Sequence, residues 1–209
     1  MMQRAEAIDQ CGSGVTSGSA HRGVLAARFQ PHPILLPDNE CLIVRAIVPQ
    51  DAKRLQDYLR GLSGESRRNR FLGALSKFAP ARLEELVRMR GPRQVLLLAL
   101  ARIGSTLQMV AEAMLVIAPN SERGEIALSV TDNWQRRGLG TVLIRHLEAR
   151  ARRAGARYLF GDVLRANTAM KSLARKSGYS IRSPFTDARL VEIVKELSPP
   201  NARPVRQAG

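Results

Sequence analysis

A glycine-rich stretch, NWQRRGLGT at residues 133–141, has the residue types of an anion-binding site. Gly138 and Gly140 permit backbone torsions and close approaches that a Cβ would prevent. The run that follows has the pattern of a helix. The first amides of a helix have no partner within it and lie at the positive end of its dipole, so they bind phosphate groups. The stretch, called the glycine turn below, therefore predicts a phosphate site, and a tight turn that binds nothing is the alternative.

Two well-known phosphate-binding motifs do not match the glycine turn. A P-loop requires GxxxxGK[ST], and the turn contains no lysine. A dinucleotide-binding fingerprint requires GxGxxG within a parallel βαβ unit, but position 143 is leucine and the runs before the turn suggest an antiparallel meander. Arg136 and Arg137 add positive charge and the Thr141 hydroxyl adds a hydrogen-bond donor, so an anion held in another structural context is favoured.

The glycine turn is positioned by predicted strands and helices on both sides. Three apolar runs joined by short polar turns precede it, which is the pattern of a meander. The run after it carries apolar side chains on one stripe and arginines mostly outside that stripe, as an amphipathic helix does. Asn167 is a predicted helix N-cap and Gly178 a predicted helix stop. Strands are expected at residues 41–48, 94–103, 107–118, 125–130, 156–164 and 188–197, and helices at 49–62, 78–90, 139–154 and 167–178.

Three parts of the chain are distinguished by their composition. Residues 1–39 are small, polar and proline-containing, and we expect a flexible leader in which only ILLP packs on the domain. Residues 40–197 form the expected single domain, and residues 198–209 a flexible tail. Cys11 and Cys41 have no CxxC spacing, so neither a disulfide framework nor a zinc site is expected. This cysteine usage makes a reducing cytoplasm the expected compartment. No run approaches about 20 apolar residues, so no membrane span is expected.

The charge balance favours an anionic partner. The chain has 33 Lys and Arg, of which 28 are Arg, against 18 Asp and Glu, for a formal net charge of +15. Such an excess fits nucleic acid, an acidic protein or a polyphosphate cofactor, and it equally fits an arginine-rich composition spread over a solvated surface. Aromatic residues make up only 4%, and no helix-turn-helix or aromatic RNA-binding motif is present, so nucleic acid is not favoured.

The order of these elements resembles the GNAT superfamily of acyl-coenzyme A N-acyltransferases. The resemblance is carried by VTDNWQRRGLGTVLIRHL and by LFGDVLRANTAMKSLARKSGYS. The upstream segment IVRAIVPQDAKRLQDYLRGLSGESRRNRFLGALSKF is similar to the start of the GNAT domain in bacterial protein lysine acetyltransferases. Together these stretches cover about residues 41–196. The resemblance implies an α/β GNAT fold, with a mixed, mostly antiparallel central sheet of six to seven strands flanked by about four helices.

The resemblance also implies acetyl-CoA as the acyl donor and no metal. The glycine turn would hold the pyrophosphate, and the edge of the strand at 125–130 would pair with the pantetheine arm. The strand at 156–164 would splay from it. For Asn167 a plain N-cap is the alternative role, and both roles are compatible. The coenzyme-binding residues expected in this way are Leu128, Ser129, Val130, Gln135, Arg136, Arg137, Gly138, Leu139, Gly140, Thr141, Asn167 and Met170.

A carboxylate is needed for the chemistry that the resemblance implies. A lysine amine has a pKa of about 10.4 in water and attacks a thioester only when neutral, so a nearby carboxylate is expected to take up its proton. The protein-acetylating relatives place a glutamate base where this sequence has Glu125, and a solvated carboxylate at a turn edge is the alternative. Asp162, within the apolar run LFGDVL, is the second candidate, unless it only pairs with an arginine. Many relatives have a tyrosine that protonates the leaving thiolate at the position of Ala174. No general acid is therefore assigned.

The leading hypothesis is therefore an acetyl-CoA-dependent N-acetyltransferase whose preferred acceptor is a protein lysine, on an acidic or metabolic-enzyme protein. The alternatives are a non-catalytic acyl-CoA-binding regulatory module and a small-molecule amine acetyltransferase. A monomer and a homodimer are equally compatible with the sequence. Trp134 and Tyr179 are expected to pack in the core, and the arginines Arg67, Arg68 and Arg70 are expected on a solvated face.

Overall fold

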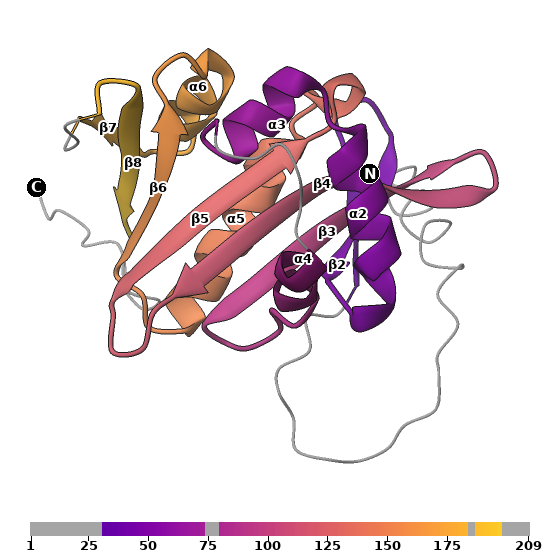
Figure 1. Ribbon diagram of the computed structural model, residues 1–209, viewed down its shortest axis with the longest axis horizontal. Coiled ribbons are helices and arrows are strands. Elements are labelled where there is room, and N and C mark those ends of the chain that lie inside the picture. The colour runs from indigo at the N-terminus through magenta and orange to yellow at the C-terminus, as the bar shows by residue number, and fades with distance from the viewer. Residues whose placement is uncertain (1–30, 74–79, 184–186, 198–209) are drawn as a thin grey trace, which may run out of the picture.

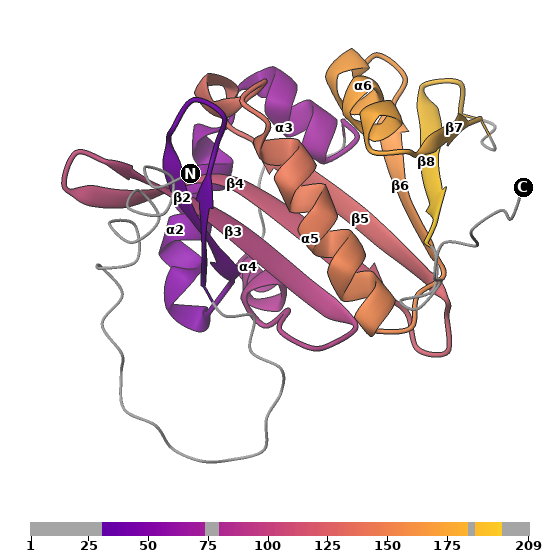
Figure 2. The ribbon, with the colours of Figure 1, turned by 180° about the vertical axis from the view of Figure 1, so that it is seen from behind.

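One eight-stranded sheet organises the chain in the computed structural model, which describes residues 31–73, 80–183 and 187–197. The strand order is β1-β2-β3-β4-β5-β6-β8-β7, and helices cover both faces (Figures 1 and 2). The strands are β1 (His32–Leu35), β2 (Cys41–Ala46), β3 (Gln94–Ile103), β4 (Thr106–Ile117), β5 (Arg123–Val130), β6 (Tyr158–Leu164), β7 (Ser180–Arg182) and β8 (Leu190–Glu196). The helices are the 3₁₀ turns η1 (Pro49–Asp51) and η2 (Asp132–Trp134), and α2 (Ala52–Gly61), α3 (Gly64–Arg70), α4 (Pro80–Val87), α5 (Leu139–Arg153) and α6 (Thr168–Lys176).

Two hydrophobic cores lie on opposite faces of this sheet. On one face α5 buries Leu143, Ile144 and Leu147 completely against the strands, as its predicted apolar stripe requires. On the other face α2 and α4 bury Leu55, Leu59 and their neighbours. Because the central strands β3 and β4 are covered on both sides, their runs are apolar almost throughout instead of alternating. The two faces are called the α5 face and the α3 face below, the second after the short helix that lies over β5 (Figure 1).

The strands β5 and β6 separate soon after they begin, and this separation shapes the site. They run parallel and pair at only three positions, ending at Glu125 opposite Phe160. Beyond this point β6 remains paired with β8 on its other side. Gly161 follows the last pair, and a Cβ built on it would lie 2.6 Å from the carbonyl oxygen of Ile126. Only glycine therefore allows the two backbones to approach this closely at the point where they part.

The expected elements are confirmed with small shifts of their ends. The meander is formed by β3, β4 and β5 in antiparallel pairs, and the sheet is mixed and mostly antiparallel as expected. It has eight strands instead of six or seven because β1 and β7 extend its edges. The strand β1 lies within the range expected to be a flexible leader, and Leu36 after it is only 1% exposed, so ILLP does pack on the domain. Residues 1–30 and 198–209 of the expected leader and tail lie outside the described residues.

Two further observations concern the expectations from composition. Cys41 lies at the start of β2, and Cys11 lies outside the described residues. Within the described ranges, no helix has the length and apolar character required to cross a membrane.

The contact at Gly161 can be tested by replacing it with alanine. Because the new Cβ would collide with a backbone oxygen and not with a movable side chain, the Gly161→Ala protein should be less stable by about 1–3 kcal/mol. The melting temperature should fall by roughly 3–8 °C. Gly61→Ala on α2 is the matched control, since no atom lies within 4 Å of its added Cβ, and its melting temperature should be unchanged or slightly raised. Equal melting temperatures for both variants would contradict this account of the separation.

Candidate active site

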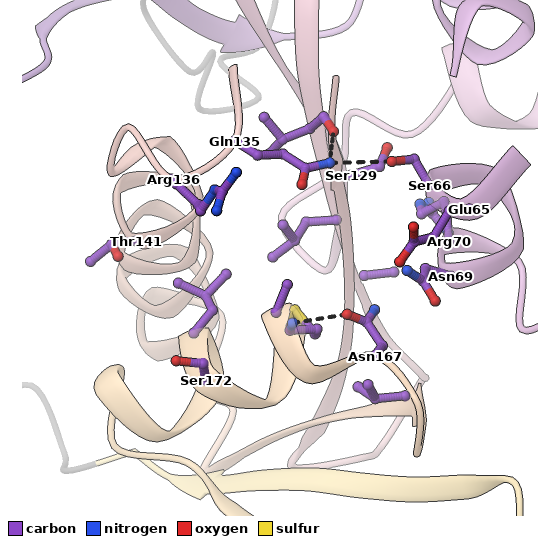
Figure 3. A pocket seen from close by; sticks show the side chains of 18 of the residues that line it. Glu65, Ser66, Asn69, Arg70, Ser129, Gln135, Arg136, Thr141, Asn167 and Ser172 are labelled. Atoms are coloured by element: carbon purple, nitrogen blue, oxygen red, sulfur yellow. Dashed lines mark hydrogen bonds between the residues drawn. The ribbon is translucent and has the colours of Figure 1, made fainter. Parts of the chain in front are cut away.

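A cavity of about 580 Å³ lies where β5 and β6 separate. Its walls come from β5, β6, α3, α6 and the glycine turn with the start of α5 (Figure 3). A volume of this size is typical of cofactor and substrate sites. Most of the expected coenzyme-binding residues line it, namely Leu128, Ser129, Val130, Gln135, Arg136, Gly138, Gly140, Thr141, Asn167 and Met170.

The cavity is bordered by residues from both faces of the sheet. Along β5 the side chains of Ile126 and Leu128 pack into the core on the α5 face. Ala127 belongs to the opposite core, and Ser129 bonds to Tyr58 of α2. All four β5 residues line the cavity, so residues that belong to opposite faces of the sheet border the gap between β5 and β6.

The glycine turn takes the backbone conformation that an anion-binding turn requires. Gly138 has a left-handed φ of 88°, and Arg136 is a left-handed non-glycine residue with φ 59°. The first helical residue of α5 follows directly, so the first amides of the helix lie at the cavity wall. Gly140 is confined by α6, because a Cβ there would lie 2.8 Å from Leu173 Cδ2. The absence of side chains at both glycines thus lets the turn curve and lets α5 approach α6.

Two of the expected coenzyme-binding residues do not line the cavity. Leu139 is 1% exposed and packs in the core of the α5 face. Arg137 carries its guanidinium over the ring of Trp134, 4.2 Å from the ring centroid, and pairs with Asp38 and Glu40. The side chain of Arg136, by contrast, lies at the cavity (Figure 3). Of the two adjacent arginines, only the first is placed where its side chain could meet a bound anion.

A polar cluster joins α3 to the glycine turn. Asp132 Oδ1 accepts hydrogen bonds from Ser63 Oγ (3.2 Å), from Ser66 Oγ (2.6 Å) and from Gln135 Nε2 (3.1 Å). Gln135 Nε2 also donates to the carbonyl of Val130 at 3.0 Å, at the end of β5 (Figure 3). The side chain of Gln135 therefore fixes the turn to the strand and to α3. This connection was not expected from the sequence.

Asn167 forms the predicted N-cap of α6. Its Oδ1 accepts a hydrogen bond from the backbone amide of Met170 at 2.9 Å (Figure 3), as N-cap asparagines do. Asn167 also lines the cavity. The two roles considered for this residue are therefore compatible in space.

Both candidate carboxylates lie on the α3 face beside the gap. Glu125 is exposed and is the last β5 residue paired with β6. It lies two residues before Ala127, which lines the cavity, so the two positions are roughly 7 Å apart along the strand. It does not line the cavity itself and forms no ion pair with any residue in the described part of the chain. Asp162 lies on β6 and does line the cavity, and partial burial and then the neighbouring Glu192 raise the pKa of its carboxyl group. It too forms no ion pair among the described residues, so the pairing with an arginine considered for it is not found.

A buried ion pair supports the wall of the cavity on the α3 face. Glu112 of β4, 1% exposed, accepts hydrogen bonds from Nε and Nη2 of Arg70 and from Ser129 Oγ at 2.7 Å. Ser129 Oγ is also 2.9 Å from the hydroxyl of Tyr58. Burial tends to lower the pKa of the Arg70 guanidinium, but the Glu112 carboxylate outweighs it and the pKa is raised. The network joins α2, α3, β4 and β5 behind the cavity.

This network corrects one expectation about the arginines. The side chain of Arg70 is only 10% exposed and lines the cavity, so the expectation of a solvated face is wrong for it. Arg67 is turned back to the carbonyls of Arg60 and Leu62. Of the three, Arg68 alone is exposed. Glu112 went unnoticed in the sequence, although a single acid inside the apolar run LQMVAEAMLVIA requires a partner. Trp134 and Tyr179 are buried at 8% and 4% exposure, as expected.

The fold and the sequence together define the class of this protein. The model of the acetyltransferase (GNAT) family matches residues 71–179, which is more than half of the chain. The chain therefore belongs to the GNAT family, whose members are acetyl-CoA-dependent N-acetyltransferases. The expected fold and enzyme class are thereby confirmed.

Individual relatives agree with this assignment. The chain is 29% identical over 144 residues to Acetyltransferase PA5475 of Pseudomonas aeruginosa, covering 69% of this chain and 77% of that protein. Its fold matches the GNAT domain of S. lividans PAT with a TM-score of 0.71 and 27% identity, over 80% of this chain and 97% of that domain. A cAMP-binding acyltransferase from Mycobacterium smegmatis shares the fold with a TM-score of 0.58 at 23% identity, and this chain spans 52% of its length.

The buried pair Arg70–Glu112 yields a stability prediction. Replacing Arg70 by methionine leaves the Glu112 charge buried without its main partner, so the Arg70→Met protein should lose about 3–5 kcal/mol of unfolding free energy. Replacing both residues by methionine should restore at least half of this loss, because no buried charge remains. Urea unfolding of the three proteins measures both differences. Arg68→Met, on the exposed side of the same helix, is the control and should change stability by less than about 0.5 kcal/mol. A double variant that is no more stable than Arg70→Met would contradict a coupled buried pair.

Proposed function

We propose that this protein transfers the acetyl group of acetyl-CoA directly to an amine, with a protein lysine as acceptor and Glu125 as general base. The observation that carries the proposal is the cavity beside the point where β5 and β6 part, which residues from both faces of the sheet line. The glycine turn lies at this cavity, and the two candidate carboxylates lie on the α3 face beside it. This arrangement suits a polyanionic donor and a cationic acceptor that meet between them.

On the α5 face the proposed ligand is the pyrophosphate of acetyl-CoA. The amides of the glycine turn and the guanidinium of Arg136 supply the positive potential. Beyond Glu125 the edge of β5 that faces β6 pairs with no strand of the described residues. The pantetheine arm, which contains two amides, is expected to use the exposed backbone groups of Leu128 to Val130 as a paired strand would.

On the α3 face the proposed chemistry is proton removal from the attacking amine. The amine nitrogen attacks the thioester carbonyl carbon, the carbon–sulfur bond breaks, and the acetyl group ends on nitrogen as an amide. Glu125 first takes one proton from the ammonium group to give the neutral amine. After the attack the nitrogen loses a second proton to solvent, and the coenzyme A thiolate takes one proton from solvent. Glu125 does not line the cavity, so a water molecule between it and the amine is part of the proposal. Glu125 lies close enough to the cavity-lining Arg70 to help raise the pKa of that guanidinium, which supports its position beside the cavity.

The choice of acceptor rests on charge and on similarity. Glu125 and Asp162 flank the gap, and Glu65 lines the cavity from α3. A positively charged amine is attracted to such a surface. The likeness to the GNAT domain of S. lividans PAT, together with the resemblance of the segment around Ser63 and Ser66 to protein lysine acetyltransferases, supports a lysine on a protein over a free amine.

Coenzyme binding can be tested at Gly138. This residue has φ 88°, which a β-branched side chain adopts only with strain. Gly138→Val should therefore distort the glycine turn and weaken coenzyme A binding at least about tenfold. Isothermal titration calorimetry with coenzyme A measures the change in Kd, and saturating acetyl-CoA should raise the melting temperature of the wild type but raise that of the variant far less. Unchanged affinity in the variant would remove the glycine turn from the coenzyme site.

The base can be tested with Glu125→Gln. Loss of a general base should lower kcat about 10²- to 10³-fold, while the Kd for coenzyme A stays within about twofold. The measurement is release of the coenzyme A thiol at pH 7.5 with poly-L-lysine, L-lysine and spermidine as acceptors. Glu122→Gln is the matched control, because Glu122 is an exposed carboxylate just before β5 that pairs with Arg157.

Other outcomes distinguish the remaining hypotheses. If Glu125→Gln keeps full activity and Asp162→Asn loses it, the base is Asp162. If wild type and Glu125→Gln are equally inactive with every acceptor while acetyl-CoA still raises the melting temperature, the protein is an acyl-CoA-binding regulatory module. Activity confined to spermidine or L-lysine would favour a small-molecule amine acetyltransferase.

A further inference from the structure

The turn between β1 and β2 contacts the glycine turn, although the two are far apart in the sequence. Arg137 donates from Nε to Asp38 Oδ2, and its Nη2 lies 3.6 Å from Glu40 Oε1. A Cβ built on Gly138 would lie 3.7 Å from Pro37 Cδ. Figure 2 shows the β1–β2 hairpin reaching the loop before α5. Residues 37–40, called the acidic turn below, therefore cover the outer side of the glycine turn, opposite the cavity.

The acidic turn is itself firmly held. Leu36, just before it, is 1% exposed and belongs to the core of the α5 face. Leu36 N donates to the carbonyl of Glu40 at 2.9 Å, and Asn39 N donates to the carbonyl of Leu36 at 3.0 Å. Farther along, the rings of His32 and His146 stack with centroids 6.1 Å apart, which joins β1 to α5. The two carboxylates are thus presented to Arg137 by a fixed support.

The glycine turn contains strain that such a support would offset. Arg136 has φ 59°, a left-handed conformation that costs a non-glycine residue of order 1–3 kcal/mol. Its neighbour Arg137 is held on three sides, by Asp38, by Glu40 and by the ring of buried Trp134. Fixing Arg137 restricts the torsions of the adjacent residue. The side chain of Arg136 is then kept at the cavity while that of Arg137 is kept away from it.

We propose that Asp38 and Glu40 are positioning residues for the coenzyme: through Arg137 they hold the glycine turn in the conformation that binds the pyrophosphate. In this role Arg137 supports the glycine turn and is not a ligand of the phosphates. The contacts of Arg137 with Asp38 and Glu40 are called the brace below. The inference rests on the proposed coenzyme site, and it adds residues from a part of the chain that precedes the matched family region.

The brace has a specific kinetic signature. If the glycine turn adopts its binding conformation for only a fraction of the time, the apparent affinity for coenzyme falls by that fraction while the bound complex is unchanged. Loss of the brace should therefore raise KM for acetyl-CoA and leave kcat at saturation unchanged. Exposed ion pairs contribute modestly, so an increase of about threefold to tenfold is expected.

The experiment compares three variants with the wild type: Asp38→Ala/Glu40→Ala, Arg137→Ala, and the triple combination. Calorimetry with coenzyme A gives Kd, and thermal melting without coenzyme reports on the fold. Removing the two acids and removing Arg137 should each weaken binding about threefold to tenfold, with the melting temperature of the free protein within about 2 °C of wild type. The triple variant should bind no worse than Arg137→Ala, because all three changes remove one interaction.

A phosphate-binding role of Arg137 makes opposite predictions. If Arg137 contacts the coenzyme, removing Asp38 and Glu40 frees it, and Kd falls or stays the same while Arg137→Ala alone weakens binding. That result, or additive effects in the triple variant, would overturn the proposal. Asp57→Ala is the matched control, since Asp57 pairs with exposed Lys53 on α2 at 2.8 Å, and it should leave Kd unchanged.

The Gly138→Val variant separates failure of the brace from failure of the coenzyme site. If Gly138→Val loses binding while the acid-removed variant keeps it, the glycine turn binds coenzyme and only the brace is refuted. If the wild type itself binds no coenzyme A, the proposed site fails and the brace fails with it.

Discussion

The early separation of β5 from β6 is the constraint on which the site depends. A sheet normally satisfies the backbone groups of each strand by pairing along its length, but β5 and β6 pair at only three positions. Gly161 lets the two backbones lie close together at the point where they part, because a side chain there would meet the carbonyl of Ile126. Once the strands part, the meander holds β5 from one side and β8 holds β6 from the other. Each wall of the gap is thus supported by its own neighbours, and the gap stays open without a strand across it.

Charged residues are used in two ways in this arginine-rich chain. Around the site they are buried or partly buried in defined pairs, of which Arg70 with Glu112 and Lys195 with Glu148 are the clearest. The first joins α3 to β4 behind the α3 face, and the second joins β8 to α5 on the other face. Elsewhere, exposed pairs such as Lys53 with Asp57 lie on helix surfaces. The net charge of +15 is therefore a poor guide to function. Arginines near the cavity, such as Arg70 and Arg137, form ion pairs with carboxylates of the same chain.

Local patterns predicted the elements well, and contacts between distant segments could not be predicted from them. The glycine turn, the N-cap at Asn167 and the stripe of α5 follow from spacing within a few residues, and each is found where expected. The same reasoning placed Arg70 in solvent and left Glu112 unnoticed, since their pairing joins residues 42 positions apart. It also treated Arg136 and Arg137 as equivalent. The side chain of Arg136 lines the cavity, whereas that of Arg137 pairs with the carboxylates at 38 and 40, a contact that no periodicity in the turn reveals.

The contact between Asp38 and Arg137 also bears on the order in which the molecule is completed. These residues are 99 positions apart, so the contact closes a long loop and forms late compared with the local pairing of the β3–β4 hairpin. During synthesis the acidic turn leaves the ribosome before the glycine turn and α5 are made. Its contact with Arg137 can form only after that. A shortened protein that begins at residue 41 would retain β2 to β8 and the core residues on those strands, yet it would lack the acidic turn. Boundaries drawn around the family-like region alone would therefore remove a contact to the glycine turn that the full chain possesses.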